Sequence, residues 1–121
     1  LPPEQVIDHE VLDELRAVLG GEVDRLIDVF LDDTPQLIIK LEAAAFGPDF
    51  DALREAAHSL KSSSANLGAM ALSGAAKRVE LGARLKTLDR PAVAVAVIAR
   101  EFERAREALL AGAAHAPAET G

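Results

Sequence analysis

Apolar residues recur along most of the chain at steps of three and four positions, the spacing that places side chains on one face of an α-helix. No strand-like alternation of apolar and polar residues competes with this pattern. Glycine, proline and aspartate interrupt it at regular points, as is typical of helix ends and turns. The pattern predicts five helices, over about residues 8–20, 22–45, 48–68, 70–88 and 92–111.

The apolar stripe of each long helix defines the expected core. Its members are Val23, Ile27, Phe30, Thr34, Leu37, Leu41 and Ala45 in the second helix, Phe50, Leu53, Ala57, Leu60, Ser64 and Leu67 in the third, Leu72, Ala76, Val79 and Ala83 with Leu81, Leu85 and Leu88 beside them in the fourth, and Val95, Ile98, Phe102, Ala105 and Leu109 in the fifth. Four long amphipathic helices with short connections predict an all-α fold, an antiparallel up-down-up-down four-helix bundle with a short additional N-terminal helix.

Composition agrees with one small helical domain. The chain has 121 residues, half of them apolar, and its aromatic residues are four Phe. We expect residues 1–7 to be a linker, 8–111 the bundle and 112–121 a flexible C-terminal tail. The absence of cysteine excludes disulfides and thiolate metal sites.

Charge narrows the classes of partner. The formal net charge of −7 argues against binding to nucleic acid or to anionic membrane surfaces. No apolar run approaches the roughly 18 residues of a transmembrane helix, so direct membrane insertion is not expected.

A group of polar residues on the third helix does not belong to the core. His58 lies one position, about 100°, away from the apolar stripe. Its neighbours at helical spacing are Arg54, Glu55, Lys61, Ser62 and Ala65. The imidazole is therefore expected at the surface with a cation one turn away, although a surface histidine near a lysine also arises by chance. His9 and His115 lack such surroundings.

This arrangement suits phosphoryl transfer. A neutral imidazole is a nucleophile near pH 7, and Lys61 places a positive charge where a phosphoryl group on His58 would lie. The small residues Ser62 and Ala65 allow another protein to approach. On the fourth helix a polar line could reach the imidazole, and a carboxylate there would fix its tautomer. That line is Ser73, Lys77, Glu80 and Arg84.

The segment "AHSLKSSSANLGAMAL", residues 57–72, resembles the signature of histidine-containing phosphotransfer domains, A-H-x-L-K-G-S-S-x-x-L-G-A-x-x-L. The segments "VFLDDTPQLIIKLEAA" and "KRVELGAR" are similar to the family's second and fourth helices. The resemblance extends from about Val11 to Leu110. One departure is Ser62, which stands where the family usually has glycine. Its hydroxymethyl group either hinders the partner or hydrogen-bonds the imidazole or a phosphoryl oxygen.

The resemblance implies a relay of phosphoryl groups between receiver domains of response regulators. His58 would be the phospho-acceptor, Lys61 the stabilising cation and Glu80 a neighbour of the imidazole. Arg84 would support the partner contact or the phosphoryl charge. The remaining residues expected to contact the partner are Arg54, Ser62, Ala65 and Lys77.

The resemblance also carries expectations about context. No cofactor is expected, because Mg²⁺ would reside in the partner's acidic pocket, and no glycine-rich phosphate loop indicates an autonomous kinase. We expect a monomeric, cytoplasmic domain that either stands alone or is tethered within a membrane-bound hybrid sensor kinase. The proline-bearing start without an initiator Met favours the second.

Two alternatives stay open. The spacing of Glu55 and His58 matches the Glu-x-x-His motif of di-metal carboxylate bundles, although no second copy is present. The other alternative is a degenerate bundle of the same fold that acts only in docking or dimerisation.

Overall fold

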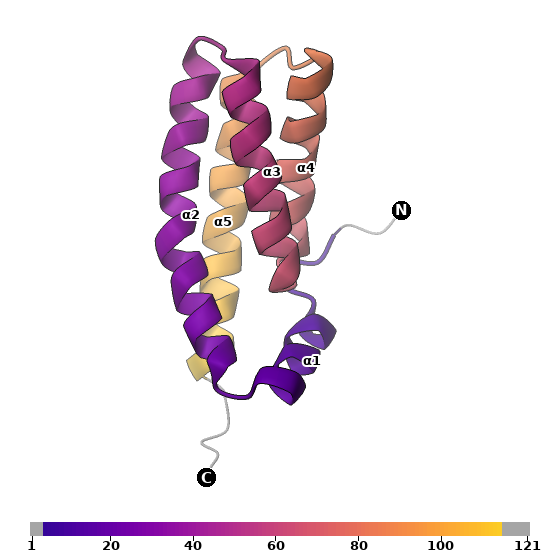
Figure 1. The fold of residues 1–121 in the computed structure, drawn as a ribbon, viewed down its shortest axis with the longest axis vertical. Coiled ribbons are helices and arrows are strands. Elements are labelled where there is room, and N and C mark those ends of the chain that lie inside the picture. The colour runs from indigo at the N-terminus through magenta and orange to yellow at the C-terminus, as the bar shows by residue number, and fades with distance from the viewer. Residues whose placement is uncertain (1–3, 115–121) are drawn as a thin grey trace.

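The computed structural model describes residues 4–114, and all of its regular secondary structure there is helical (Figure 1). α2, α3, α4 and α5 run alternately up and down, with α3 between α2 and α4 and with α5 packed against the same two helices. α1 lies beyond the end of α3. The predicted all-α bundle with an additional N-terminal helix is confirmed. The helices are α1 (His9–Leu19), α2 (Glu22–Phe46), α3 (Phe50–Asn66), α4 (Met70–Leu85) and α5 (Pro91–Ala114).

Aspartate side chains begin two of the helices. A carboxylate oxygen of Asp8 accepts a hydrogen bond from the backbone N–H of Glu10 at 3.0 Å. Asp49 accepts one from the N–H of Ala52 at 3.1 Å. Both bonds satisfy backbone donors that a helix N-terminus otherwise leaves without a partner. α3 therefore begins after Asp49, two residues later than the predicted start near residue 48, and Pro48 precedes the cap.

The fourth helix is shorter than predicted. Lys86 adopts the left-handed conformation (φ 56°, ψ 41°), and the N–H of Thr87 donates to the carbonyl of Gly82 at 2.8 Å. This reversal ends α4 at Leu85 rather than at Leu88. The side chain of Leu88 then folds back over Gly82, where an added Cβ would lie 2.7 Å from it.

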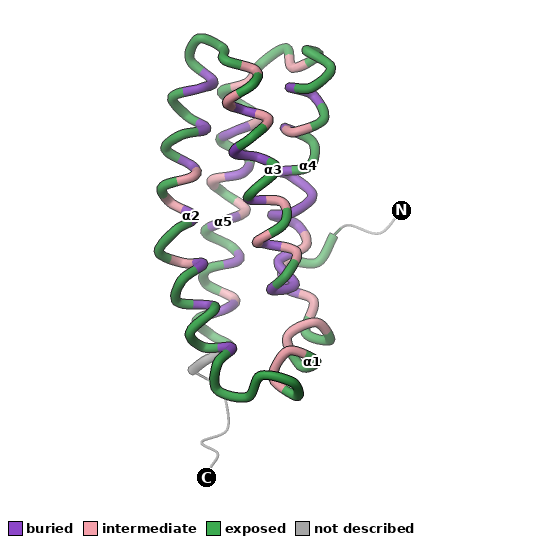
Figure 2. Tube along the Cα trace, viewed as in Figure 1, coloured by how far each residue is buried: buried purple, intermediate pink, exposed green. Residues whose placement is uncertain are grey.

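The core follows the predicted stripes with local exceptions (Figure 2). In α2, Ile38 is buried and Leu37 is only partly buried. Leu81 and Leu85 of α4, predicted to lie beside the core, are 43% and 59% exposed. The remaining predicted stripe positions are buried, apart from the partly buried Phe50 and Leu88. A ring of α2 contacts a ring of α5 edge to face, with the centroids of Phe30 and Phe102 6.0 Å apart.

Residues before α1 pack on the bundle. The N–H of Ala71, near the start of α4, donates to the carbonyl of Gln5 at 2.8 Å, and the N–H of Asp8 donates to the carbonyl of Gly68 at 2.7 Å. The side chain of Ile7 is buried. Part of the segment predicted as a linker therefore contacts α4 and the α3–α4 turn.

The other predicted boundary concerns α5. This helix reaches Ala114, beyond the predicted domain end at residue 111. The rest of the predicted tail, with His115, lies outside the described residues. Within residues 4–114, none of the helices combines the length and the apolar content that a membrane span requires.

Candidate functional site

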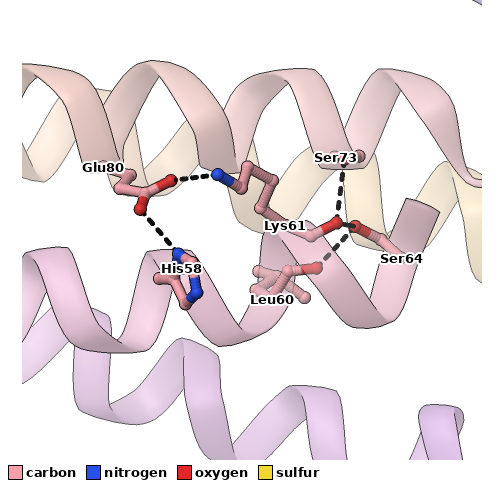
Figure 3. Close-up of polar contacts among 6 residues, drawn as sticks. All are labelled: His58, Leu60, Lys61, Ser64, Ser73 and Glu80. Atoms are coloured by element: carbon pink, nitrogen blue, oxygen red, sulfur yellow. Dashed lines mark hydrogen bonds and ion pairs between the residues drawn. The ribbon is translucent and has the colours of Figure 1, made fainter. Parts of the chain in front are cut away.

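One carboxylate of α4 holds two side chains of α3 (Figure 3). Nδ1 of His58 lies 2.7 Å from Oε2 of Glu80, and Nζ of Lys61 lies 2.7 Å from Oε1 of the same carboxylate. His58 and Lys61 are three positions apart and so project from neighbouring turns of one helix. The two oxygens of Glu80 thus bridge an imidazole and an ammonium group.

Burial differs across these three side chains. The side chain of His58 is 60% exposed, that of Lys61 is 32% exposed and that of Glu80 is 17% exposed. The carboxylate therefore lies behind the imidazole, on the side of the bundle. When Nδ1 carries its proton toward Glu80, Nε2 holds the free lone pair of the neutral ring. The exposed ring then presents a nucleophilic nitrogen.

Glu80 is held in its ionised form. The hydrogen bond from Lys61 lowers the pKa of Glu80 below its ordinary value of 4.5, and the hydrogen bond with His58 acts in the same direction. Burial opposes this shift, because desolvation disfavours the charged carboxylate. At neutral pH Glu80 is therefore a carboxylate that accepts from both neighbours.

Serine hydroxyls fix the backbone beneath Lys61. Ser73, on α4 and 7% exposed, donates to the carbonyl of Lys61 at 2.9 Å. Ser64 donates to the carbonyl of Leu60 at 2.6 Å and lies 3.2 Å from that of Lys61. The bond of Ser64 is to a carbonyl one turn earlier in the same helix. Ser73, the first residue of the predicted polar line, is buried against α3 rather than exposed.

The structure does not gather every residue predicted for the site. Arg84 is exposed on α4 one turn beyond Glu80, and in the described part of the chain its side chain has no hydrogen bond or ion pair. Lys77 is exposed, whereas Arg54 and Ala65 are partly buried. Ser62 is exposed, and over residues 4–114 its hydroxyl makes no hydrogen bond to the imidazole. Of the residues predicted for the site, His58 and Lys61 thus meet at the carboxylate of Glu80.

The geometry gives no support to a di-metal centre. Among residues 4–114, no three or more His, Cys, Asp or Glu side chains gather where a metal ion could bind. Glu55 is exposed, and the carboxylate that meets His58 comes from α4 instead.

Comparison with known families agrees with this geometry. The family model described as "Hpt domain" matches residues 25–112, a span that contains α3, α4 and their paired side chains. The chain belongs to the Hpt domain family. Membership assigns this Hpt domain to histidine phosphotransfer in two-component phosphorelays. The matched span begins within α2, so α1 and the segment before it lie outside it.

Two solved structures resemble this Hpt domain along most of its length. Histidine-containing phosphotransfer protein B from Pseudomonas aeruginosa PAO1 has 36% sequence identity and a TM-score of 0.81, over 85% of this chain and 90% of that one. The histidine-containing phosphotransfer protein ZmHP2 from maize has 28% identity and a TM-score of 0.76, over 88% of this chain and 81% of that one. No curated protein sequence matches this chain significantly.

Proposed function

We propose that this Hpt domain accepts a phosphoryl group on His58 and passes it on, exchanging it with an aspartate of receiver domains of response regulators. The observation that carries the proposal is the exposed imidazole whose Nδ1 is held by Glu80 at 2.7 Å. That contact selects the tautomer in which Nε2 is the nucleophile.

The transfer needs no external base, because the attacking nitrogen carries no proton. The lone pair of Nε2 attacks the phosphorus of an aspartyl phosphate, an N–P bond forms, and the bond between phosphorus and the carboxylate oxygen breaks. The aspartate carboxylate leaves, and the imidazole ring acquires a positive charge while Nδ1 keeps its proton. The ionised Glu80 beside Nδ1 offsets this charge. Donation to a second receiver follows the same path in reverse.

Lys61 and Arg84 are the proposed cations for the phosphoryl group. The ammonium group of Lys61 already lies beside the imidazole, on the same carboxylate, and is partly exposed. From there it can donate to phosphoryl oxygens on Nε2, which carry most of the charge during transfer. Arg84, one turn beyond Glu80, is free to turn toward the bound partner.

The metal ion for the transfer is proposed to come from the partner. We place Mg²⁺ in the acidic pocket of the receiver domain, and we assign this Hpt domain no kinase activity of its own. Its contact surface is proposed to surround His58, with Arg54, Ser62 and Ala65 on α3 and Lys77 on α4.

A chemical phosphorylation assay tests the acceptor. Wild type, His58→Gln and His9→Gln are treated with phosphoramidate, a small-molecule phosphoryl donor, and intact masses are recorded before and after acid treatment. His9 is an exposed histidine of α1 and serves as the matched control. One acid-labile phosphate is expected on wild type and on His9→Gln and none on His58→Gln. Label retained in His58→Gln would show that another residue accepts the phosphoryl group.

A second assay tests the exchange. Labelled wild-type protein is mixed with a panel of isolated receiver domains and Mg²⁺, and the loss of label from the Hpt domain is followed. Transfer to at least one receiver is expected. Labelling without transfer to any receiver would leave His58 reactive but contradict the relay, and no labelling at all would favour a bundle used only for docking.

A further inference from the structure

A groove runs between α3 and α4 directly beyond the His58 site. Its volume is about 500 Å³, and its walls include Lys61, Ser62 and Ala65 from α3 and Lys77 from α4. Ser62 lies one turn from His58 on the same side of α3. A partner that reaches the imidazole therefore also covers this groove, which contains most of the residues proposed for partner contact.

One wall of the groove comes from outside the bundle. Glu4 precedes α1 and lines the groove together with the residues of α3 and α4. Its carboxylate pairs with Arg78 at 3.4 Å and remains 48% exposed. The carbonyl of Gln5 and the N–H of Asp8 are bonded to Ala71 and Gly68, so the backbone on the C-terminal side of Glu4 is tied down. The carboxylate is held at this place by the fold.

The sequence of α4 makes room for this carboxylate. Gly74 lies inside α4, where glycine is a poorer helix former than alanine. A Cβ at Gly74 would overlap the carboxylate of Glu4. The glycine thus allows an acidic side chain to rest against α4, beside Lys77 and Arg78.

We propose that Glu4 is part of the docking surface and acts as a charge filter against receiver domains with a strongly acidic face. This inference rests on the proposed relay function, in which the partner presents an acidic, Mg²⁺-binding pocket to His58. The cations of the groove attract that pocket, and the exposed carboxylate of Glu4 repels it. Charges at the edge of an interface act mainly on the association rate and on its dependence on salt.

Association kinetics test this filter. The probe is a receiver domain to which phosphorylated wild type passes its label, and its association rate constant is measured at low and high ionic strength. Removing the charge with Glu4→Gln is expected to raise the rate constant by about two- to fivefold at low salt, and the gain should disappear at high salt. Gly74→Ala displaces the carboxylate from α4 and is expected to raise the rate constant in the same salt-dependent way, while alanine stabilises the helix.

The control separates a local effect from the net charge. Glu107→Gln changes the net charge equally, but it lies on α5, diagonally across the bundle from α3. Its rate constant is expected to match that of wild type. Equal rates for wild type and Glu4→Gln, or equal gains for both glutamine variants, would overturn the filter and leave the relay intact. If wild type passes label to no receiver, the relay and the filter both fail.

Discussion

The hydroxyl of Ser73 on α4 donates a hydrogen bond to the backbone carbonyl of Lys61 on α3, at 2.9 Å. Glu80, seven positions later on the same side of α4, holds the other end of Lys61 through Nζ. α4 thus contacts one residue of α3 at both its backbone and its side-chain terminus, and this fixes the register in which His58 meets Glu80.

Loss of the Ser73 hydroxyl should weaken the bundle. Ser73→Ala is expected to lower the free energy of unfolding by about 1 kcal/mol, the net contribution of a typical hydrogen bond. Ser64→Ala removes a hydroxyl that bonds within α3, so it should cost a similar amount. Urea unfolding measures both costs. Only Ser73→Ala should also slow phosphoramidate labelling of His58, and equal labelling in both variants would contradict a role in register.

The charge of Glu80 should give stability a defined pH dependence. Its folded-state pKa is lowered, so its contribution is present above the ordinary value of 4.5 and is lost as pH falls through the folded-state pKa. The free energy of unfolding of His58→Gln is compared with that of the double variant His58→Gln/Glu80→Gln. In this background only the ion pair between Glu80 and Lys61 remains. The stability difference should be constant near neutral pH and shrink below 4.5. A difference that stays constant down to pH 3 would refute this account.

Lys61 should prolong the lifetime of the phosphorylated histidine. Lys61→Ala is expected to shorten the half-life of the label by about fivefold, which corresponds to about 1 kcal/mol from a partly exposed charge. The half-life is read by mass spectrometry after the phosphoramidate is removed. Lys40→Ala, at an exposed lysine of α2, provides the control and should leave the half-life unchanged. Equal half-lives in both variants would contradict the stabilising role proposed for Lys61.

Ser62 should act by its bulk. In the described structure its hydroxyl does not bond to the imidazole, so we expect Ser62→Gly to speed transfer from a receiver domain and leave phosphoramidate labelling unchanged. The same change should reduce stability by roughly 0.5 kcal/mol through helix propensity. Ser59→Gly, at an exposed serine of the same helix, should cost similar stability without faster transfer. Faster transfer in both variants would point to helix loosening instead.

The sequence predicted the bundle because its helical period is strong and its turns are marked. The predictions that were wrong, the burial of two leucines and the end of α4, have geometric causes. Leu81 and Leu85 each follow a buried residue by two positions, a rotation of about 200°, so they face away from the core. The end of α4 depends on a left-handed lysine, Lys86, for which the sequence carries no glycine signal.

The site was only partly predictable for a different reason. His58 and Lys61 share one helix, so their spacing alone places them together. Glu80 is 22 positions from His58, and its contact depends on the register between two helices. The polar line on α4 offered one carboxylate, Glu80, and the family resemblance placed it near the imidazole, but the helical pattern alone did not fix the register that brings the two together. Glu4 lies in a non-helical segment without periodicity, so its place beside α4 had no sequence signal.

Gly68 joins features that otherwise look separate. It has φ of 80°, its carbonyl accepts from the N–H of Asp8, and an added Cβ would lie 2.7 Å from the Asp8 carbonyl oxygen. The same residue reverses the chain between the helices of His58 and Glu80 and anchors the segment that carries Glu4. A side chain there would disturb both the contact between His58 and Glu80 and the groove wall that Glu4 forms. The proposed phosphotransfer site and the proposed docking surface therefore depend on the same backbone position. A substitution at Gly68 would alter both of them together.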